Sequence, residues 1–392
     1  MTTPVDHAER AARAQLLRAA EPGTIGLLRH VRRVGPEQAV EDIRRAAPIA
    51  GLDVPAMAAR LLDVSADREL ELAARLGARL VCPGDKEWPV TLDDLDRVEA
   101  GCLALWVRGP SALAELCHRA VALVGTRAAT GYGLSVATEL AVGLAERGWA
   151  VVSGLALGID AAAHRGALAA AGSTVAVLAS GVDVAYPRAN RGLYDRIIET
   201  GAVVSEQPPG AAPHRTRFLV RNRLIAALSA GTVVVEAAPR SGARSTARHA
   251  AELFRHVMAV PGPVTSIQSA GCHQLLRDRP DTVVVTKVDE VIEQVGSFGE
   301  FAERVSGPVR RRDLLGPTVS RVFEAVPVLK PVPVERIAVT AGMRADATAA
   351  ALAALESAGL VMAKEGGWCM SKAGRDERRG EPVADELALG WW

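Results

Sequence analysis

The sequence lacks an excess of charge of either sign and has few aromatic side chains, and each shortage excludes a class of protein. Its 392 residues include 46 lysines and arginines against 45 aspartates and glutamates, a formal net charge of +1. A uniformly basic nucleic-acid binder is thereby excluded, so any nucleic-acid site must be a local patch. Aromatic residues make up only 4% of the chain, which excludes a broad stacking platform but leaves room for a single stacking residue.

Closely spaced cysteines and long apolar segments are also missing. The five cysteines are scattered, and no two stand at Cys-x-x-Cys spacing, so we expect neither a metal site nor a disulfide framework. The N-terminus has no apolar stretch typical of a signal peptide. The longest apolar runs, such as 349–355, are far shorter than the ~18 residues of a membrane span. We therefore expect a soluble cytoplasmic protein with no membrane partner.

The first 118 residues are predicted to form a helical module and a connector. Apolar residues recur at helical spacing in 24–34 and 36–46, with a turn at Gly35-Pro36 between them. We assign residues 1–80 to a helical N-terminal module, which either contacts nucleic-acid backbone or serves only in packing. Residues 81–118 form a connector with one short strand at 103–107.

The character of the sequence changes at residue 119, where short β-rich runs begin to alternate with helical segments. Continuous apolar strands joined by helical crossovers are typical of a parallel sheet covered on both faces. We therefore predict one doubly wound α/β domain over residues 119–295. Its expected strands are 121–124, 150–153, 174–178, 202–205, 232–236, 257–260 and 282–285.

The C-terminal part is predicted to contain a second, smaller domain. Residues 296–317 are charged and contain prolines and glycines, and they are assigned as a linker. Residues 318–371 have a winged-helix-like pattern, and residues 372–392 are expected to be a flexible tail. The expected elements are helices at 319–325, 334–341 and 346–357 and a hairpin at 360–370.

Three glycine-containing loops follow predicted strands, where ligands bind in a doubly wound sheet. The loops contain Gly125-Thr126-Arg127, Ser153-Gly154 with Gly158, and Ser241-Gly242. Glycine lets a ligand approach the backbone, and the helix that follows favours an anion. The first loop is neither a Walker A loop nor a dinucleotide fingerprint, because no Gly-Lys-Ser/Thr follows it and no acidic residue ends the next strand. It is either a phosphate site or a tight turn for helix packing.

Asp160 and His164 lie one turn apart on the helix expected after the second loop. They form either a catalytic pair or a cap plus a polar contact that shapes the loop. No serine or cysteine in a nucleophile-elbow context accompanies them. Tyr186, after the third strand, either stacks on a base or has only a structural role.

Arginines are concentrated in residues 215–255, where eight of them occur with two glutamates. Phe218 lies among these arginines. Arginine clamps on phosphates combined with one stacking ring are the minimal means of binding single-stranded DNA. The alternative is that Phe218 belongs to the core and some arginines pair with glutamates, which we expect of Arg221 or Arg223.

Taken together, these segments resemble the DprA/Smf family of DNA-processing proteins. The matches are collinear over about residues 100–295, and the flanking parts resemble the family's helical N-terminal module and its optional winged-helix domain. The matching strings are ValAlaLeuValGlyThrArg at 121–127, ValValSerGlyLeuAla-x-GlyIleAspAlaAlaAlaHis at 151–164, TyrPro-x-x-Asn at 186–190, SerGluGlnProProGly at 205–210, Phe-x-x-ArgAsnArg-x-IleAla at 218–226, ValValValGluAla at 233–237, SerGlyAla at 241–243 and AlaValProGly at 259–262.

The resemblance implies a Rossmann-like core with no cofactor and no catalytic residue. It further implies binding and protection of single-stranded DNA, loading of the RecA recombinase during natural transformation, and a homodimer. By the motif match, the residues that line the DNA pocket are Gly125, Thr126, Arg127, Ser153, Gly154, Gly158, Asp160, Arg217, Phe218, Arg221, Asn222, Arg223, Ser241 and Gly242.

The sequence departs from the family at three positions and has one competing interpretation. Leu157, Leu219 and His273 stand where the family commonly has arginine, proline and asparagine, and the first change is expected to weaken one phosphate contact. The alternative function is a nucleotide-binding, phosphoribohydrolase-like enzyme. Such enzymes carry Pro-Gly-Gly-x-Gly-Thr-x-x-Glu, whereas residues 229–236 read Ser-Ala-Gly-Thr-Val-Val-Val-Glu. The missing double glycine favours a mediator that is not an enzyme.

The C-terminal domain is expected to read DNA poorly. A recognition helix presents arginine, lysine, asparagine or glutamine at its N-terminal end. The candidate helix after Arg344 offers that one arginine, followed by Asp346. We therefore expect weak or no duplex binding, and a role in contacting protein or orienting DNA.

Overall fold

The computed structural model describes residues 5–62, 64–296 and 315–379. The chain divides into two compact units, Met1–Ala302 and Glu303–Trp392. Most of the expected linker, residues 297–314, lies outside the described residues. Within the described parts, no helix combines the length and the apolar character that a membrane crossing requires.

Five helices form the N-terminal part of the first unit, as the sequence predicts. Polar caps explain where three of them begin, because Asp6, Asp53 and Ser65 each accept a hydrogen bond from a backbone N–H in the first turn. Their apolar faces share one cluster with Trp106 and Tyr194 of the sheet domain, which supports the packing role for this module. The helices are α1 (His7–Ala19), α2 (Ile25–Val34), α3 (Pro36–Arg44), α4 (Val54–Leu61) and α5 (Ala66–Arg75).

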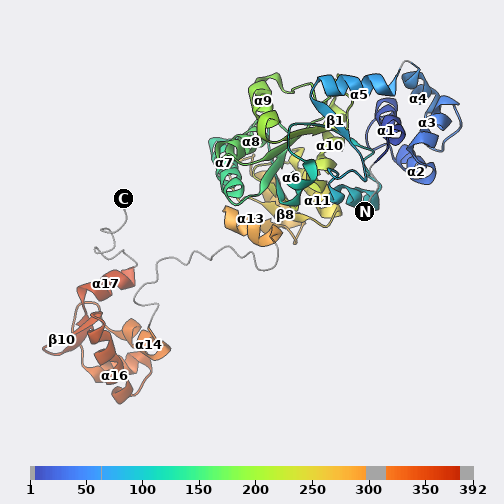
Figure 1. Cartoon of the computed structure of the whole chain (residues 1–392). Coiled ribbons are helices and arrows are strands. Elements are labelled where there is room, and N and C mark those ends of the chain that lie inside the picture. The colour runs from blue at the N-terminus through green and yellow to red at the C-terminus, as the bar shows by residue number, and fades with distance from the viewer. Residues whose placement is uncertain (1–4, 63, 297–314, 380–392) are drawn as a thin grey trace. The chain divides into compact units, whose positions relative to one another are not determined.

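A nine-stranded sheet runs through the first unit in the order β1-β2-β6-β5-β4-β3-β7-β8-β9 (Figure 1). The seven strands from β6 to β9 run parallel to one another, while β2 pairs antiparallel with both β6 and the edge strand β1. This confirms the doubly wound, mostly parallel α/β fold. The strands are β1 (Ala78–Val81), β2 (Leu105–Arg108), β3 (Ala120–Val124), β4 (Ala150–Ser153), β5 (Thr174–Val177), β6 (Ala202–Ser205), β7 (Gly231–Val234), β8 (His256–Ala259) and β9 (Val283–Val284).

The part expected to be a connector belongs to the same sheet. The predicted α/β domain begins at residue 119, but β1 and β2 precede that point and extend the sheet beyond β6. The strand β1 was not expected at all. Its four residues follow directly on α5, so the helical pattern before it hid the change of structure.

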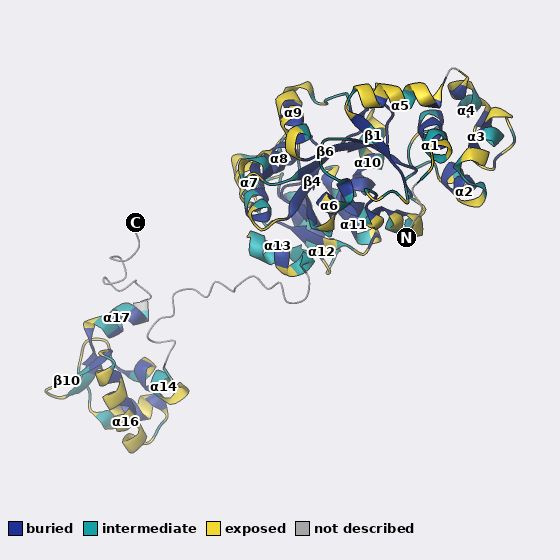
Figure 2. Cartoon of the chain, in the orientation of Figure 1, coloured by how far each residue is buried: buried dark blue, intermediate teal, exposed yellow. Residues whose placement is uncertain are grey.

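Helices cover both faces of the sheet, and the strands between them are buried (Figure 2). Alternate residues of β3 point to opposite faces: Ala122 packs in one cluster with Leu224 of α10, whereas Leu123 packs in another with Leu140 of α7. The helices of this region are η1 (Val90–Val98, a 3-10 helix), α6 (Leu113–His118), α7 (Gly131–Glu146), α8 (Ile159–Ala169), η2 (Arg188–Asn190, a 3-10 helix), α9 (Arg191–Thr200), α10 (Arg215–Ala227), α11 (Ala243–Glu252), α12 (Ala270–Asp278) and α13 (Val288–Val295).

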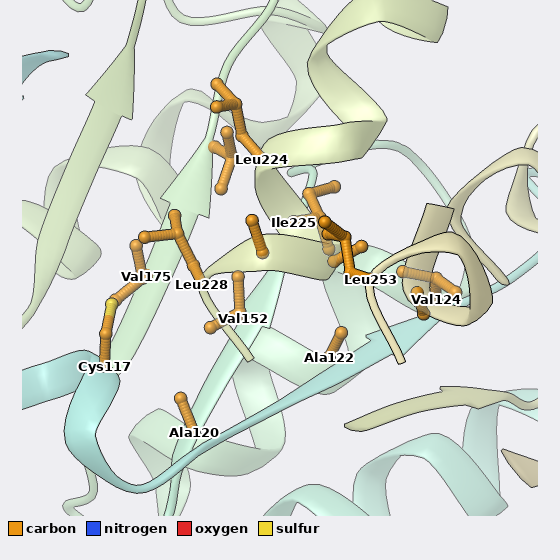
Figure 3. Packing of buried hydrophobic residues seen from close by; sticks show 14 of the residues in the cluster. Cys117, Ala120, Ala122, Val124, Val152, Val175, Leu224, Ile225, Leu228 and Leu253 are labelled. Atoms are coloured by element: carbon orange, nitrogen blue, oxygen red, sulfur yellow. The ribbon is translucent and has the colours of Figure 1, made fainter. Parts of the chain in front are cut away.

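The first of these clusters anchors α10 against the middle of the sheet. Leu228, the residue after α10, lies beside Val175 of β5 and near Val152 of β4, and Leu224 and Ile225 of α10 belong to the same cluster (Figure 3). These side chains are at most 1% exposed. Because each fully buried leucine or valine contributes about 1.5–3 kcal/mol, this packing fixes α10 at the carboxyl ends of the strands.

The second unit contains three helices, a hairpin and a fourth helix. Phe323, Leu352 and Leu355 are buried in its core, and Val332 forms a bridge to Trp368 beside the hairpin. The helices and hairpin match the expected elements, while their classification as a winged helix stays a prediction. The elements are α14 (Pro317–Ala325), α15 (Val334–Ala341), α16 (Ala345–Ser357), β10 (Val361–Lys364), β11 (Gly367–Met370) and α17 (Lys372–Arg379).

The flexible tail expected from residue 372 is wrong for its first eight residues, which form α17. Ser371 Oγ caps this helix by accepting a hydrogen bond from Gly374 N at 2.9 Å. Arg378 Nη2 pairs with Glu324 Oε2 at 3.0 Å and so ties α17 to α14. The high charge of residues 372–379 indicated a mobile segment, but the Ser371 cap and the Arg378–Glu324 ion pair stabilise a helix there. Residues 380–392 lie outside the described residues.

Candidate nucleic-acid interface

A cavity of about 770 Å³ opens at the carboxyl ends of β3, β4 and β7. At β3 the chain order reverses, because β4 lies on one side of it and β7 on the other. Such a reversal point is where doubly wound sheets bind ligands. We call this cavity the central pocket. It is lined by Val124, Gly125, Thr126, Arg127, Ala156, Asp160, Tyr186, Pro213, Arg215, Phe218, Leu219, Arg221, Asn222, Ile225, Ala238, Arg240, Ser241, Gly242, Ala243, Ser245 and Thr246.

The loop after β3 is held against β7. Thr126 N donates to Glu236 O at 2.7 Å, and Thr130 donates to the Glu236 carboxylate from both its N, at 3.0 Å, and its Oγ, at 2.6 Å. A Cβ at Gly125 would lie 2.8 Å from Glu236 O, so only glycine permits this close approach. The result places the exposed Arg127 at the pocket.

A ring and two guanidinium groups meet at the pocket wall. The Arg127 guanidinium carbon lies 5.0 Å from the centre of the Phe218 ring, and that of Arg221 lies 6.0 Å from it. The Tyr186 ring is centred 5.7 Å from the Phe218 ring, tilted by 47°. Phe218 is only partly buried, so it does not belong to the core. Cations near an aromatic face, beside open space, can hold a base and its phosphate together.

Below Phe218, the floor of the pocket carries a buried charge of each sign. Arg221 is 6% exposed and Asp160 is 6% exposed. Burial lowers the pKa of Arg221 to about 10, although Asp160 opposes the shift. Burial likewise raises the pKa of Asp160, against the effect of Arg221. At neutral pH Arg221 therefore keeps its proton and presents a positive charge at the floor.

Hydrogen bonds join this floor to the loop after β4. Arg221 Nη1 donates to Gly154 O at 3.0 Å and also to Val177 O, and Gly154 N donates to Asp160 Oδ2 at 3.1 Å. A Cβ at Gly154 would lie 2.6 Å from Arg221 Nη1. Glycine at position 154 therefore leaves the space that the Arg221 guanidinium occupies. The sequence predicted that Gly154 contacts the ligand directly.

The structure brings together nine of the fourteen residues that the family resemblance assigned to DNA. These nine line the central pocket: Gly125, Thr126, Arg127, Asp160, Phe218, Arg221, Asn222, Ser241 and Gly242. The other five do not line it: Ser153, Gly154, Gly158, Arg217 and Arg223. Their assignment to DNA stays a prediction, and the structure gives each of them another contact.

Ser153 and Gly158 lie beneath the pocket. Ser153 is fully buried, and its Oγ donates to Leu123 O at 2.6 Å. Gly158 precedes α8 and packs under the carbonyl oxygens of Thr126 and Arg127. Together with Gly154, these residues support the pocket loops from below.

Arg217 and Arg223 are both engaged by glutamates. Arg217 forms a two-point ion pair with Glu21 of the N-terminal part, at 2.6 and 2.8 Å. Arg223 is 3% exposed, and its Nη2 lies 2.8 Å from Glu206 Oε1. The expectation that Arg221 or Arg223 forms an internal pair therefore holds for Arg223. Arg217 was not expected to pair, because Glu21 is 196 residues away.

Asp160 and His164 use separate partners. The Thr174 hydroxyl donates to Val151 O at 2.6 Å, so His164 Nδ1 donates to Thr174 Oγ at 2.7 Å. Burial lowers the pKa of His164 to about 3. The histidine is therefore neutral, buried and absent from the pocket lining. This arrangement favours the structural interpretation over a catalytic pair.

Several lining residues were not assigned to the site from the sequence, among them Arg215, Arg240 and Thr246. Arg215 and Arg240 were counted in the arginine-rich stretch, but only the fold shows that both reach this pocket. The only sequence signal for these two residues was their place in the arginine-rich stretch of residues 215–255. Within residues 5–62, 64–296 and 315–379, no three histidine, cysteine or carboxylate side chains are placed to hold a metal ion.

Comparisons with known proteins agree with this architecture. A family model described as DNA recombination-mediator protein A matches residues 79–296. The chain is 45% identical to the putative DNA processing protein DprA of Mycobacterium tuberculosis, over 95% of this chain and 97% of the relative. The chain belongs to the DprA/Smf family. This confirms the resemblance found in the sequence and makes the chain a member of a family of DNA-processing recombination mediators.

Other DprA/Smf proteins extend the comparison. The Smf protein of Escherichia coli is 36% identical over 68% of this chain and 71% of its own length. The X-ray structure of DNA processing protein A from Streptococcus pneumoniae has a TM-score of 0.63 at 29% identity, covering 76% of this chain and all of that one. The DprA fold therefore extends over about three quarters of the chain.

Proposed function

We propose that this protein binds and protects single-stranded DNA in the central pocket and loads the RecA recombinase onto it during natural transformation. It acts in the cytoplasm as a homodimer, with no cofactor and no catalytic step. Membership of a family of DNA-processing recombination mediators supports this proposal. The site itself supports the choice of ligand.

The observation that carries the proposal is the stack of Arg127 on Phe218 at the pocket wall. An unpaired base has a free face that can lie on a ring, whereas bases in a duplex are already stacked. Arg127 is exposed and can bind the phosphate of the same nucleotide through two N–H groups. A ring and an arginine select for single strands without reading the base sequence.

The N-terminus of α11 adds to the attraction for phosphate. The lining includes Ser241 and Gly242, which precede α11, and Thr126 and Arg127, which precede α7. Backbone N–H groups at the start of a helix carry a partial positive charge. A DNA backbone passing over the pocket meets the start of α11, whereas the start of α7 is occupied by the Glu236 carboxylate through Thr130.

The competing function, hydrolysis of a nucleotide, has less support. Glu236 would be its acidic residue, but this carboxylate is 1% exposed and accepts two hydrogen bonds from Thr130. It is absent from the pocket lining. Incubation with a nucleoside monophosphate should therefore release no ribose 5-phosphate, and release above background would favour the enzyme.

The C-terminal unit is proposed not to read duplex DNA. Arg344, the single arginine at the start of the candidate recognition helix, pairs with Asp346 at 2.9 Å. Its charge is thereby partly neutralised at the position where base contacts are made. A truncated chain of residues 1–298 should keep most of its affinity for single strands, and loss of that affinity would contradict this assignment.

Fluorescence anisotropy of a labelled oligothymidylate and of a matching duplex, across a salt series, tests the proposal. We expect salt-dependent binding that strongly prefers the single strand. Absence of binding at low salt would contradict DNA binding. A RecA assembly assay on the same single strand then tests loading: the protein should accelerate assembly, and an equal rate without it would contradict that part.

A further inference from the structure

A second cavity, of about 760 Å³, lies beside the central pocket and has no role in the function proposed above. We call it the side groove. It is formed by the end of η1, the next face of α10, the first turns of α11 and the end of α12, together with the chain entering α2. Leu219 and Ser245 line both cavities. The side groove therefore continues directly from the central pocket.

A buried arginine with unused N–H groups lines the side groove. Arg223 is 3% exposed, and its Nη2 donates to Glu206 at 2.8 Å and to Gly101 O at 3.2 Å. Its Nε and Nη1 have no hydrogen-bond partner among the described residues. An unsatisfied buried donor costs about 1–3 kcal/mol, and more when charged. A ligand in the groove that supplies a hydrogen-bond acceptor to Nε and Nη1 removes this cost.

Three further arginines on the groove have only long ion pairs, although Arg244 also donates to Pro239 O at 2.7 Å and to Gln274 Oε1 at 2.9 Å. The nearest nitrogen–oxygen distance is 3.8 Å from Arg244 to Asp278, 3.6 Å from Arg248 to Glu252 and 3.3 Å from Arg279 to Asp281. Exposed pairs of this kind contribute only about 0–1 kcal/mol, so a phosphate can replace the carboxylate. The lining holds four arginines against two carboxylates, Glu99 and Asp278.

The start of α11 connects the two cavities. This helix has no side-chain cap at Gly242, and its first residues face the central pocket and the side groove in turn. Ser241 Oγ accepts a hydrogen bond from Ala243 N at 3.3 Å, so the partial positive charge of this helix N-terminus, rather than free N–H groups, attracts an anion between the two cavities. Apolar side chains, among them Leu219, Val98 and Leu275, complete the groove and can cover a base.

We propose that the side groove binds the next segment of the same DNA strand, with its phosphates on Arg223, Arg248 and Arg279 and a base against the apolar wall. The strand leaves the central pocket past Leu219 and the start of α11. This inference rests on the proposed function, since it needs single-stranded DNA in the central pocket. It adds a second binding subsite that only a longer strand can reach.

Binding of oligothymidylates of about four to about 16 nucleotides to the full-length chain tests the subsite. The test variant is Arg248→Ala/Arg279→Ala, which leaves the central pocket lining intact. The control is Arg277→Ala, which removes one positive charge two residues from Arg279 at an exposed position outside the groove lining. Thermal unfolding of all three proteins checks that they are equally folded.

We expect the double variant to bind the shortest strand like the wild type and the longest strand about tenfold more weakly. Its salt slope for the longest strand should fall by about 1.4, because two phosphate contacts are lost. The control should match the wild type at every length. Free thymidine monophosphate at equal nucleotide concentration should not displace the long strand.

Each other outcome contradicts a specific claim. Equal binding of the long strand by wild type and double variant overturns the side groove while the central pocket stands. Equal weakening at all lengths also overturns it, since the two arginines would then act on the first subsite. Displacement by the free nucleotide makes the groove a nucleotide site instead. If the wild type binds no strand of any length, the proposed function fails and the inference with it.

Discussion

The two halves of α10 both carry arginines and differ sharply in burial. The first half, from Arg215 to Leu219, is largely open to solvent, and Leu219 is 51% exposed. The second half, from Arg221 to Ala227, is entirely buried. Both halves contain arginines, so charge alone does not separate them. The difference teaches that in this helix the distance from the sheet decides whether the charge of an arginine is exposed to solvent or must be balanced by a buried acidic partner.

The physical cause is the direction of the helix relative to the core. α10 begins after an exposed loop and ends where Leu224 and Ile225 pack on the strands (Figure 3). Arg223 is carried into this region and must be paired there, because an isolated buried charge is strongly destabilising. Phe218 stays at the edge, where a ligand can reach it.

The largest expected effect is on stability, from Arg223→Leu in the buried half. The substitution leaves Glu206 buried without its partner and should lower the free energy of unfolding by about 3–5 kcal/mol. Arg217→Leu is the matched control, since its partner Glu21 is exposed, and it should cost at most about 1 kcal/mol. Urea unfolding measures both. Similar losses in the two variants would show that the halves of α10 do not differ as described.

The next effect is on affinity, from Phe218→Ala in the open half. Loss of the ring should weaken binding of an oligothymidylate by about 1–3 kcal/mol, or roughly fivefold to 150-fold. The salt slope should stay unchanged, because no phosphate contact is removed. Phe218→Tyr keeps the ring and should bind like the wild type. If Phe218→Ala and the wild type gave the same binding curve, Phe218 would not stack on a base.

A smaller effect concerns pH, because the buried His164 stays neutral in the folded chain. Its pKa falls from 6.5 to about 3, so between these values the unfolded chain binds more protons. Stability is therefore full above pH 6.5 and declines as the pH falls, by up to about 1.4 kcal/mol per pH unit. In His164→Gln this decline should be smaller.

Urea midpoints of both proteins between about pH 7 and about pH 5 measure this difference. The raised pKa of Asp160 acts in the opposite direction, but it is present in both proteins and cancels in the comparison. A difference in stability between wild type and variant that does not change with pH would contradict a neutral, buried His164.

The smallest effect is on salt dependence, from Arg127→Ala at the open wall of the pocket. Removing one phosphate contact should lower the salt slope of oligothymidylate binding by about 0.7. Arg127→Lys keeps the charge and should keep the slope while losing the two-point geometry. An unchanged slope in the alanine variant would place the phosphate elsewhere.

Much of the sheet could be predicted from the sequence because its strands are short β-branched runs between helical segments. Residues 150–153 and 202–205 were predicted with the bounds of β4 and β6. The edge strand β1 was not, since its pairing with β2 depends on residues 24 to 30 positions away. Local pattern carries no information about such a partner.

The site was predicted in part for the same reason. The glycine loops and Phe218 follow from their place after strands and among arginines, and they meet in one pocket. The partner of Arg217 could not be predicted, because Glu21 reaches it only through the packing of the N-terminal helices. The buried position of Arg223 depends likewise on how deeply α10 enters the core.

Photocrosslinking tests the central claim most directly. An oligothymidylate that carries 4-thiothymidine is irradiated with the full-length protein, and the modified peptides are identified by mass spectrometry. We predict attachment at the wall and rim of the central pocket, within residues 213–222 and 238–246. Attachment confined to residues 315–379 or to the N-terminal helices would contradict the assignment of the central pocket to single-stranded DNA.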